Sequence, residues 1–355
     1  MLDHTGLELR SLRLIAGMTA VASLGAILLG MKVGVPTSEI LTAYASEIWS
    51  LALPALLFGL IVFFIRSAIL RRPSPIEDLR PFVARHFRSV DSASGLLGPL
   101  ILMPIVLAAY GTLKQIMPLV RPLSWDGEIA EAGRLMFGGN RPWRLTHAVF
   151  GGPLPTELLD RAYTFWVPLL YFAVLVMAWF ASPRRRAQFF LSFTGAWLIL
   201  GVVVGFLLAS AGPCYALAIG SSSAPEFAAL MARLHAIEAS GHHLASLDWQ
   251  RTLWYAQTQH RYGFGMGISA MPSMHCAIAF LYVLAANGTR LWLRITTWAF
   301  AITILIGSVH LGWHYAADGI AAWAGMALIW WGAGGYLDAG VRQHSQAGEL
   351  APAVA

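Results

Sequence analysis

The chain alternates between long apolar stretches and short polar connections. A helix that crosses a bilayer needs about 20 mostly apolar residues, because hydrocarbon offers an open backbone no hydrogen-bond partner. Residues 93–113, 162–181 and 188–210 meet this without a single charged side chain. The whole pattern predicts an all-α integral membrane protein with about eight transmembrane helices, at 14–31, 48–65, 93–113, 162–181, 188–210, 271–286, 295–312 and 319–336.

The composition excludes several soluble classes of protein. Hydrophobic residues make up 57% of the 355-residue chain and charged residues 12%, against roughly 25% charged in an average soluble domain. The net charge of +6 suits anionic lipid head groups, but it is too diluted among apolar residues for a nucleic-acid-binding protein. Two cysteines are too few for a disulfide-stapled mini-protein or a four-cysteine zinc site.

The arginines indicate the orientation. They gather in the connections on one side of this topology, and short positively charged loops stay in the cytoplasm. We therefore expect an inner (plasma) membrane protein with both termini inside and two long loops outside. Residues 1–92 then hold two spans and a basic loop, 93–337 the catalytic core, and 338–355 a disordered tail. A secretory signal is the alternative for the first span, although its apolar run exceeds the usual ~7–15 residues.

One outer loop contains a predicted helix at 221–241. Ser223-x-x-Glu226 resembles a capping box with Pro225 in the first turn, and apolar residues follow at helical spacing. This helix lies either on the outer membrane surface or packed on the bundle. The adjacent pair His242-His243 is interpreted as solvated loop, because no partner at metal-ligand spacing accompanies it.

Three polar clusters fall at the outer ends of predicted spans, at 114–122, 271–275 and 310–318. Polar groups this close to hydrocarbon are costly, which makes them functional candidates. Lys114 and Arg121 supply fixed positive charge, and a guanidinium can bind two phosphate oxygens at once. Pro272 at a helix start leaves the amide of Ser273 and its neighbours free to bind an anion.

Two histidines suit the transfer of a phosphoryl group. His314 and Asp318 are four residues apart and would share a face on a helix, so the carboxylate can fix the imidazole tautomer. A histidine held in this way can act as a nucleophile, with His275 as general acid.

Together these residues resemble the type 2 phosphatidic acid phosphatase superfamily of membrane phosphoryl-transfer enzymes, over roughly residues 93–336. Its first signature, KxxxxxxRP, is met by Lys114, Arg121 and Pro122. Its second, PSGH, is met at 272–275 with Met274 in place of glycine.

The third signature, SRxxxxxHxxxD, is met only in part. His314 and Asp318 match, but Gly307 and Ser308 stand where the family has Ser-Arg. A site without that arginine is better matched to a phosphodiester, with its single negative charge, than to a phosphomonoester. The inositol phosphorylceramide synthase branch is similar, with PSxH and no arginine in the third signature. Arg251 or Arg261 is an alternative source of the missing charge.

The resemblance implies a six-helix core and a phosphohistidine mechanism without metal or cofactor. His314 would attack phosphorus, Asp318 would orient it, and His275 would protonate the leaving oxygen. Lys114, Arg121 and Ser273 would bind the phosphate oxygens. We expect a transferase that moves a phosphoryl or inositol-phosphate-type head group from a lipid donor, with a lipid phosphate phosphatase as the alternative.

Several other interpretations of these residues stay open. A non-catalytic lipid transporter is a second alternative function, although spans 93–113, 162–181 and 188–210 carry no charge and transporters keep polar groups near the bilayer midplane. His310 can form a metal-binding face with His314 and Asp318, and Asp318 can also cap the last helix. Cys214 and Cys276 are either free thiols or a disulfide.

Overall fold

The computed structural model describes residues 6–71, 74, 80–81, 83–84 and 87–349. Over these residues the chain is helical and contains no β-strand. The helices are α1 (Leu7–Val33), α2 (Thr37–Ile69), α4 (Val90–Val120), α5 (Asp126–Met136), α6 (Pro142–Phe150), α7 (Pro153–Thr164), α8 (Trp166–Phe180), α9 (Pro183–Gly195), η1 (Ala196–Val204), α10 (Gly205–Leu207), η2 (Pro213–Tyr215), α11 (Ala224–Ala239), α12 (Ala245–Thr258), α13 (Met274–Ala286), α14 (Leu291–His310) and α15 (Ala316–Glu349).

Six helical stretches among the described residues are long and apolar enough to cross a membrane. They are Leu7–Val33, Val90–Val120, Pro153–Phe180, Pro183–Leu207, Leu291–His310 and Ala316–Gly340. Each overlaps a predicted span, and the all-α membrane fold is confirmed. The stretch Pro183–Leu207 combines α9, α10 and the π-helical η1 between them, so one span of the core departs from regular α-helix.

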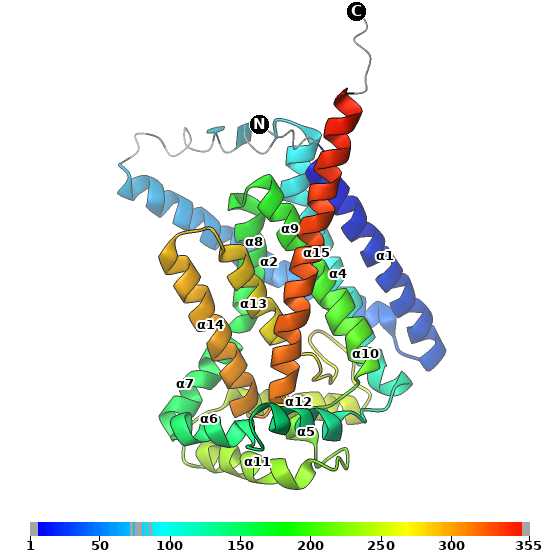
Figure 1. Ribbon diagram of the computed structural model, residues 1–355, viewed down its shortest axis with the longest axis vertical. Coiled ribbons are helices and arrows are strands. Elements are labelled where there is room, and N and C mark those ends of the chain that lie inside the picture. The colour runs from blue at the N-terminus through cyan, green and yellow to red at the C-terminus, as the bar shows by residue number, and fades with distance from the viewer. Residues whose placement is uncertain (1–5, 72–73, 75–79, 82, 85–86, 350–355) are drawn as a thin grey trace, which may run out of the picture.

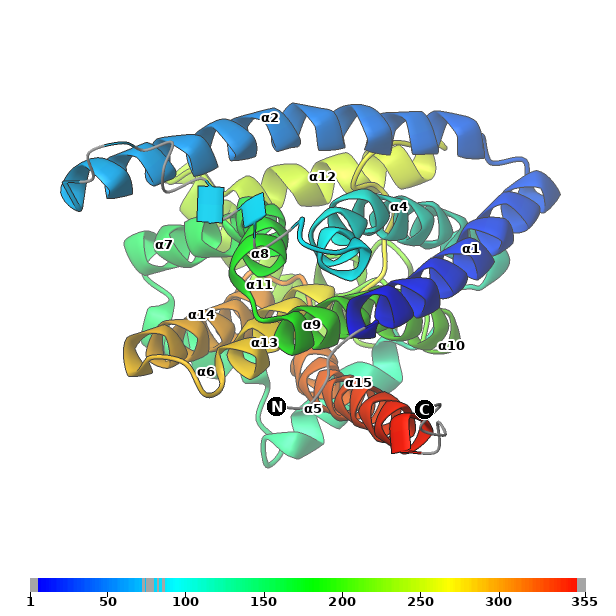
Figure 2. The same cartoon turned by 90° about the horizontal axis from the view of Figure 1, so that it is seen from above.

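The other two predicted spans differ from these six. Helix α13 has 13 residues, which is shorter than a crossing needs; Cys276, Ala277 and Leu281 on it are fully buried, so it lies inside the bundle. The predicted span 48–65 falls within α2. Viewed from above, α2 is seen along its length, whereas α4 and α8 are seen nearly end-on (Figure 2). Helix α2 therefore runs obliquely across the bundle.

Four helices of the long connecting segments, α5, α6, α11 and α12, lie across the lower end of the bundle and form a cap (Figure 1). Helix α11 turns its apolar side inward, with Phe227, Leu230 and Leu234 buried in a cluster with residues of α5 and the start of α15. Of the two placements predicted for 221–241, the structure shows the helix packed on the bundle.

The predicted capping box at the start of α11 does not form. The Ser223 side chain makes no capping hydrogen bond, because its Oγ is 2.9 Å from Ser221 Oγ and 3.4 Å from the Tyr315 hydroxyl. Glu226 forms an ion pair with Arg141 of the loop before α6 instead. Contacts with Ser221, Tyr315 and Arg141 thus take the place of the predicted capping box.

At the opposite end of the molecule, several helix ends are rich in arginine, and ion pairs connect these helices. Arg186 of α9 pairs with Glu8 of α1 at 3.0 Å, each side chain 4% exposed, and Arg184 pairs with Asp338 of α15 at 2.6 Å. The start of α1 and the far part of α15 also lie at this upper end (Figure 1). The sequence predicts disorder from Asp338 onward, but α15 stays helical to Glu349.

Candidate active site

The second polar cluster forms the start of α13. Ser273 is the N-cap of this helix, and its Oγ accepts a hydrogen bond from the Cys276 amide at 3.4 Å. Its own amide donates to the Asp318 carbonyl oxygen at 3.3 Å. Ser273 is fully buried and therefore joins the start of α13 to the start of α15.

His314 and Asp318 come together as predicted, but not on one helix. Asp318 lies in the first turn of α15, and its Oδ2 accepts the Tyr315 amide at 3.0 Å, the backward half of a capping box. The same oxygen is 3.3 Å from His314 Nδ1. His314 precedes the helix, and its amide donates to the Ser308 carbonyl at 3.0 Å. The carboxylate thus caps the helix and orients the imidazole, while its Oδ1 has no hydrogen-bond partner within the part of the chain that the structure describes.

His275 faces His314 across the site, with the two ring centroids 6.3 Å apart. Its ring stacks on Tyr163 of α7 at 4.6 Å and packs against Trp166 of α8 at 4.1 Å. The Trp166 indole N–H donates to the His275 carbonyl at 3.1 Å. These contacts hold the His275 ring between aromatic side chains.

The two cations of the first cluster differ in exposure. Lys114 is half-buried on α4. Arg121 is the exposed C-cap of the same helix. In the described part of the chain, neither cation has a carboxylate partner. The fold thus brings Ser273, His275, His314 and Asp318 to one place, while Lys114 and Arg121 remain proposed members of the site.

Ser308, at the position of the family's arginine, is a structural residue in this chain. It is fully buried, and its hydroxyl donates to the Leu305 carbonyl at 2.8 Å and lies 3.8 Å from the Cys276 thiol. Cys214 and Cys276 are both free. Arg251 is held by Glu238 and Asp248 at 3.0 and 2.6 Å, and these bonds raise its pKa. Arg251 is therefore not available to replace the missing charge.

His310 does not join His314 and Asp318. Its buried ring stacks on His147 of α6 at 3.9 Å and lies 3.0 Å from the Thr156 hydroxyl. His147 Nε2 is 2.9 Å from the His310 carbonyl, and burial lowers the pKa of His147. No group of three or more histidine, cysteine or acidic side chains within the described ranges has the geometry to hold a metal ion.

Sequence reasoning missed Asp126, which accepts a hydrogen bond from Tyr315, the residue that follows His314. This carboxylate is 1% exposed, and accepts hydrogen bonds from the amides of Ala211 and Gly212 and from the Tyr315 hydroxyl, the last at 2.9 Å. Burial raises the pKa of Asp126, against these three hydrogen bonds, which lower it. An aspartate at the start of a helix in a long connecting segment gives no signal in the sequence that it is buried and bonded to Tyr315.

Fold and site together define a helical membrane protein with two facing histidines where the bundle meets its cap. The family model of the PAP2 (type 2 phosphatidic acid phosphatase) superfamily matches residues 134–332. This is more than half of the chain, and the protein belongs to that superfamily. The matched region contains Ser273, His275, His314 and Asp318 but not Lys114 or Arg121. No curated protein and no solved structure matches the chain.

Proposed function

We propose that this protein is a membrane phosphotransferase that moves a phosphoryl or inositol-phosphate-type head group from a lipid donor through a phosphohistidine at His314. Superfamily membership supports a lipid phosphatase or phosphotransferase type of function. The observation that carries the proposal is the arrangement of His314 between Asp318, 3.3 Å from its Nδ1, and His275, 6.3 Å away between ring centroids.

The first step follows from that arrangement. With Nδ1 directed at Asp318, Nε2 of His314 is free to attack, and it has no hydrogen-bond partner among the described residues. The N–P bond forms as the bond from phosphorus to the leaving oxygen breaks, and His275 gives that oxygen its proton. The buried Asp318 carboxylate stabilises the positive charge that develops on the His314 ring.

In the second step the phosphoryl group moves from His314 to the oxygen of an acceptor. His275, now without its proton, takes one from the hydroxyl of the acceptor, whose oxygen attacks phosphorus as the N–P bond breaks. The acceptor is an alcohol in a transferase and water in a phosphatase. A histidine that alternates between acid and base in this way leaves the enzyme unchanged after each cycle.

Three groups are suited to hold the phosphate oxygens. Lys114 is half-buried and has no anionic partner in the residues that the structure covers, so a substrate anion can pair with it without breaking an existing bond. Ser273 begins α13, where the partial positive charge of a helix start favours an anion. Arg121 is exposed at the end of α4 and is proposed to bind the phosphate from the edge of the site.

Ser308 favours transfer from a phosphodiester. A hydroxyl at the position of the family's arginine carries no positive charge, and this one is engaged with Leu305 and Cys276. The same departure is the basis for proposing the inositol phosphorylceramide synthase branch. The unpaired cations Lys114 and Arg121 favour the second candidate, a phosphatase acting on lipid monophosphates or isoprenyl diphosphates.

The test is an assay of the purified protein in detergent with phosphatidic acid, isoprenyl diphosphate, and phosphatidylinositol plus a ceramide or diacylglycerol acceptor. Both free phosphate and new phospholipid are followed. We expect a new phosphodiester lipid that His314→Ala fails to make, and wild-type activity in His243→Ala, whose side chain is 74% exposed. Phosphate release without lipid product would identify a phosphatase. The absence of any product above the His314→Ala background would count against the catalytic site and favour a lipid transporter.

A further inference from the structure

The connection between α14 and α15, residues 311–315, carries His314 and lies against the cap (Figure 1). The last four carbonyl groups of an α-helix have no partner within that helix. Those of 307–309 accept hydrogen bonds locally, from amides of 311–314. The next three carbonyl groups each accept one hydrogen bond at 2.9 Å from a separate element: His310 from His147 Nε2 of α6, Leu311 from Gln250 Nε2 of α12, and Gly312 from the Cys214 amide of η2. Elements other than α14 and α15 therefore fix the backbone of the connection.

Side chains on both sides of His314 also bond to the cap. The Trp313 indole N–H donates to the Ser246 hydroxyl of α12 at 3.0 Å. The Tyr315 hydroxyl donates to Asp126, at the start of α5, at 2.9 Å. The His314 ring instead has its partner on α15. The cap thus holds the residues before and after the proposed nucleophile, while the imidazole itself bonds to the bundle.

Close packing leaves the connection little room to shift. Gly312 has a φ of +74°, in the left-handed region, and a Cβ there would lie 3.1 Å from the sulfur of Met231 on α11. A Cβ on Gly212, just before η2, would collide with the Trp313 carbonyl oxygen. Both close approaches require glycine. They place α11 and the segment before η2 directly against the connection, at the density of a packed interior.

Gln250 is the cap residue best placed to fix this connection. It is 4% exposed, and its side-chain amide reaches the carbonyl of Leu311, a fully buried residue 61 positions further along the chain. The backbone carbonyl of Gln250 accepts the Tyr215 hydroxyl at 3.0 Å, so η2 and α12 are joined at the same residue. A buried carbonyl without a donor is unfavourable, and the connection is therefore expected to move when this donor is removed.

We infer that Gln250 is a positioning residue for the proposed nucleophile, because it holds the connection that carries the His314 ring. The inference rests on the proposed function and gives the cap a part in catalysis. Gln250 acts through the Leu311 carbonyl and not by contact with the substrate. A displacement of about 1 Å can slow a reaction by about 10²-fold. The proposed phosphate-binding residues lie on α4 and at the start of α13, outside the connection, so substrate binding should be retained.

Gln250→Leu removes the donor and keeps a side chain of similar size. Steady-state kinetics are measured in detergent with phosphatidylinositol plus diacylglycerol and with phosphatidic acid. We expect kcat to fall by about 10–100-fold and KM to stay within about twofold of wild type. Gln188→Leu is the matched control, because the Gln188 side-chain amide also donates to a backbone carbonyl, that of Trp330, at 3.0 Å. This bond joins α9 to α15 away from the connection, and its loss should leave kcat unchanged.

Hydrogen exchange of a peptide covering 308–316, followed by mass spectrometry, tests the connection without turnover. Its amides bond to carbonyls at the end of α14, and such bonds open more often where a segment is held less firmly. We expect faster exchange in Gln250→Leu and no change in Gln188→Leu. Ser246→Ala, which removes only the partner of the Trp313 indole, serves if Gln250→Leu does not fold. It should speed the same exchange and lower kcat about two- to tenfold, the size of one neutral hydrogen bond.

Three results would overturn the inference: a kcat for Gln250→Leu within about twofold of wild type, unchanged exchange in 308–316, or an equal fall of kcat in Gln188→Leu. Wild-type kcat and exchange in Ser246→Ala have the same meaning. Failure of the proposed function is distinguishable, because wild type then gives no product above the His314→Ala background, and both proposals fall. Where the inference alone fails, wild type exceeds that background and Gln250→Leu equals wild type.

Discussion

At the scale of the residue, Asp318 combines two tasks in one side chain. One of its oxygens accepts the Tyr315 amide and also lies 3.3 Å from His314 Nδ1. The first contact fixes the start of α15 and the second fixes the imidazole. Because the two contacts share one oxygen, the position of the proposed nucleophile is tied to the geometry of a helix end.

The substitution Asp318→Asn distinguishes the helix cap from the interaction with His314. The amide oxygen can still cap the helix, but the negative charge that favours a developing imidazolium is lost. We expect kcat to fall by about 10²–10⁴-fold with little change in melting temperature. Steady-state kinetics and thermal unfolding measure the two effects. Asp248→Asn, at the surface beside Arg251, should behave as wild type, and a fully active Asp318→Asn would exclude the proposed role.

At the scale of the element, small residues let the helices of the bundle approach closely. A Cβ at Gly111 of α4 would collide with the Tyr44 hydroxyl of α2. That hydroxyl also accepts the Gly265 amide at 3.4 Å, and the Tyr44 ring packs on Phe264 at 4.9 Å. Gly111 therefore permits a contact that joins α2, α4 and the loop before α13.

Gly111→Ala is expected to destabilise the protein by about 1–3 kcal/mol, the usual cost of overpacking a well-filled interior. Gly332→Ala is the matched control, because Gly332 is also helical but has no atom within 4 Å of its added Cβ. That change should be neutral or stabilise by up to about 1 kcal/mol. Thermal unfolding in detergent gives both values. Equal melting temperatures for the two variants would contradict the packing of α2 on α4.

At the scale of the whole molecule, the arginine-rich helix ends and the candidate site lie at opposite ends. Arg184 and Arg186 pair with Asp338 and Glu8 at the upper end, and the cap helices cover the lower end (Figure 1). Since short positively charged loops remain in the cytoplasm, this separation predicts that the site opens on the outer side of the membrane.

Thiol labelling in intact cells tests this orientation. A membrane-impermeant maleimide should modify His243→Cys, near the cap, without permeabilisation, and modify Arg290→Cys, at the start of α14, only after the membrane is opened. The wild-type chain controls for its two native thiols, of which Cys276 is buried. The reverse pattern would place the site in the cytoplasm.

The sequence by itself determined six of the eight predicted spans and named the candidate side chains of the site. Six predicted spans overlap apolar helices, although some of these helices begin up to nine residues earlier. The overlap arises because the length and hydropathy of a span are local properties. Ser273, His275, His314 and Asp318 were also readable as short motifs with fixed spacing. Their meeting at one place follows from which ends of the spans face the same side.

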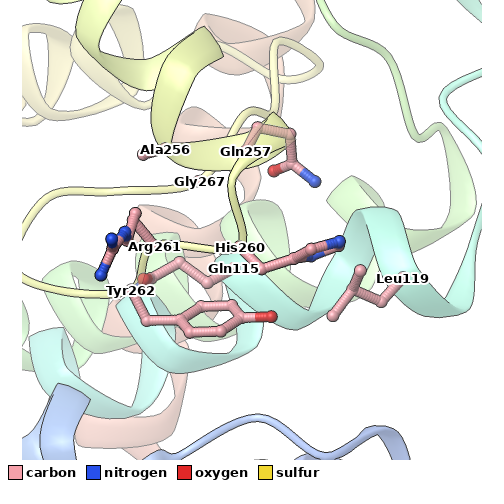
Figure 3. A pocket seen from close by; sticks show the side chains of 8 residues that line it. All are labelled: Gln115, Leu119, Ala256, Gln257, His260, Arg261, Tyr262 and Gly267. Carbon is pink, nitrogen blue, oxygen red and sulfur yellow. The ribbon is translucent and has the colours of Figure 1, made fainter.

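Only the tertiary structure decided which partner each polar group takes. Arg251 and Arg261 are equivalent in the sequence, yet the fold gives Arg251 two carboxylates and leaves Arg261 beside a depression between the ends of α4 and α12 (Figure 3). His310 stacks on His147, which precedes it by 163 residues. The bonds of Asp126 join segments 85 or more residues apart. Such pairings depend on packing across the whole chain, and no local pattern of residues specifies them.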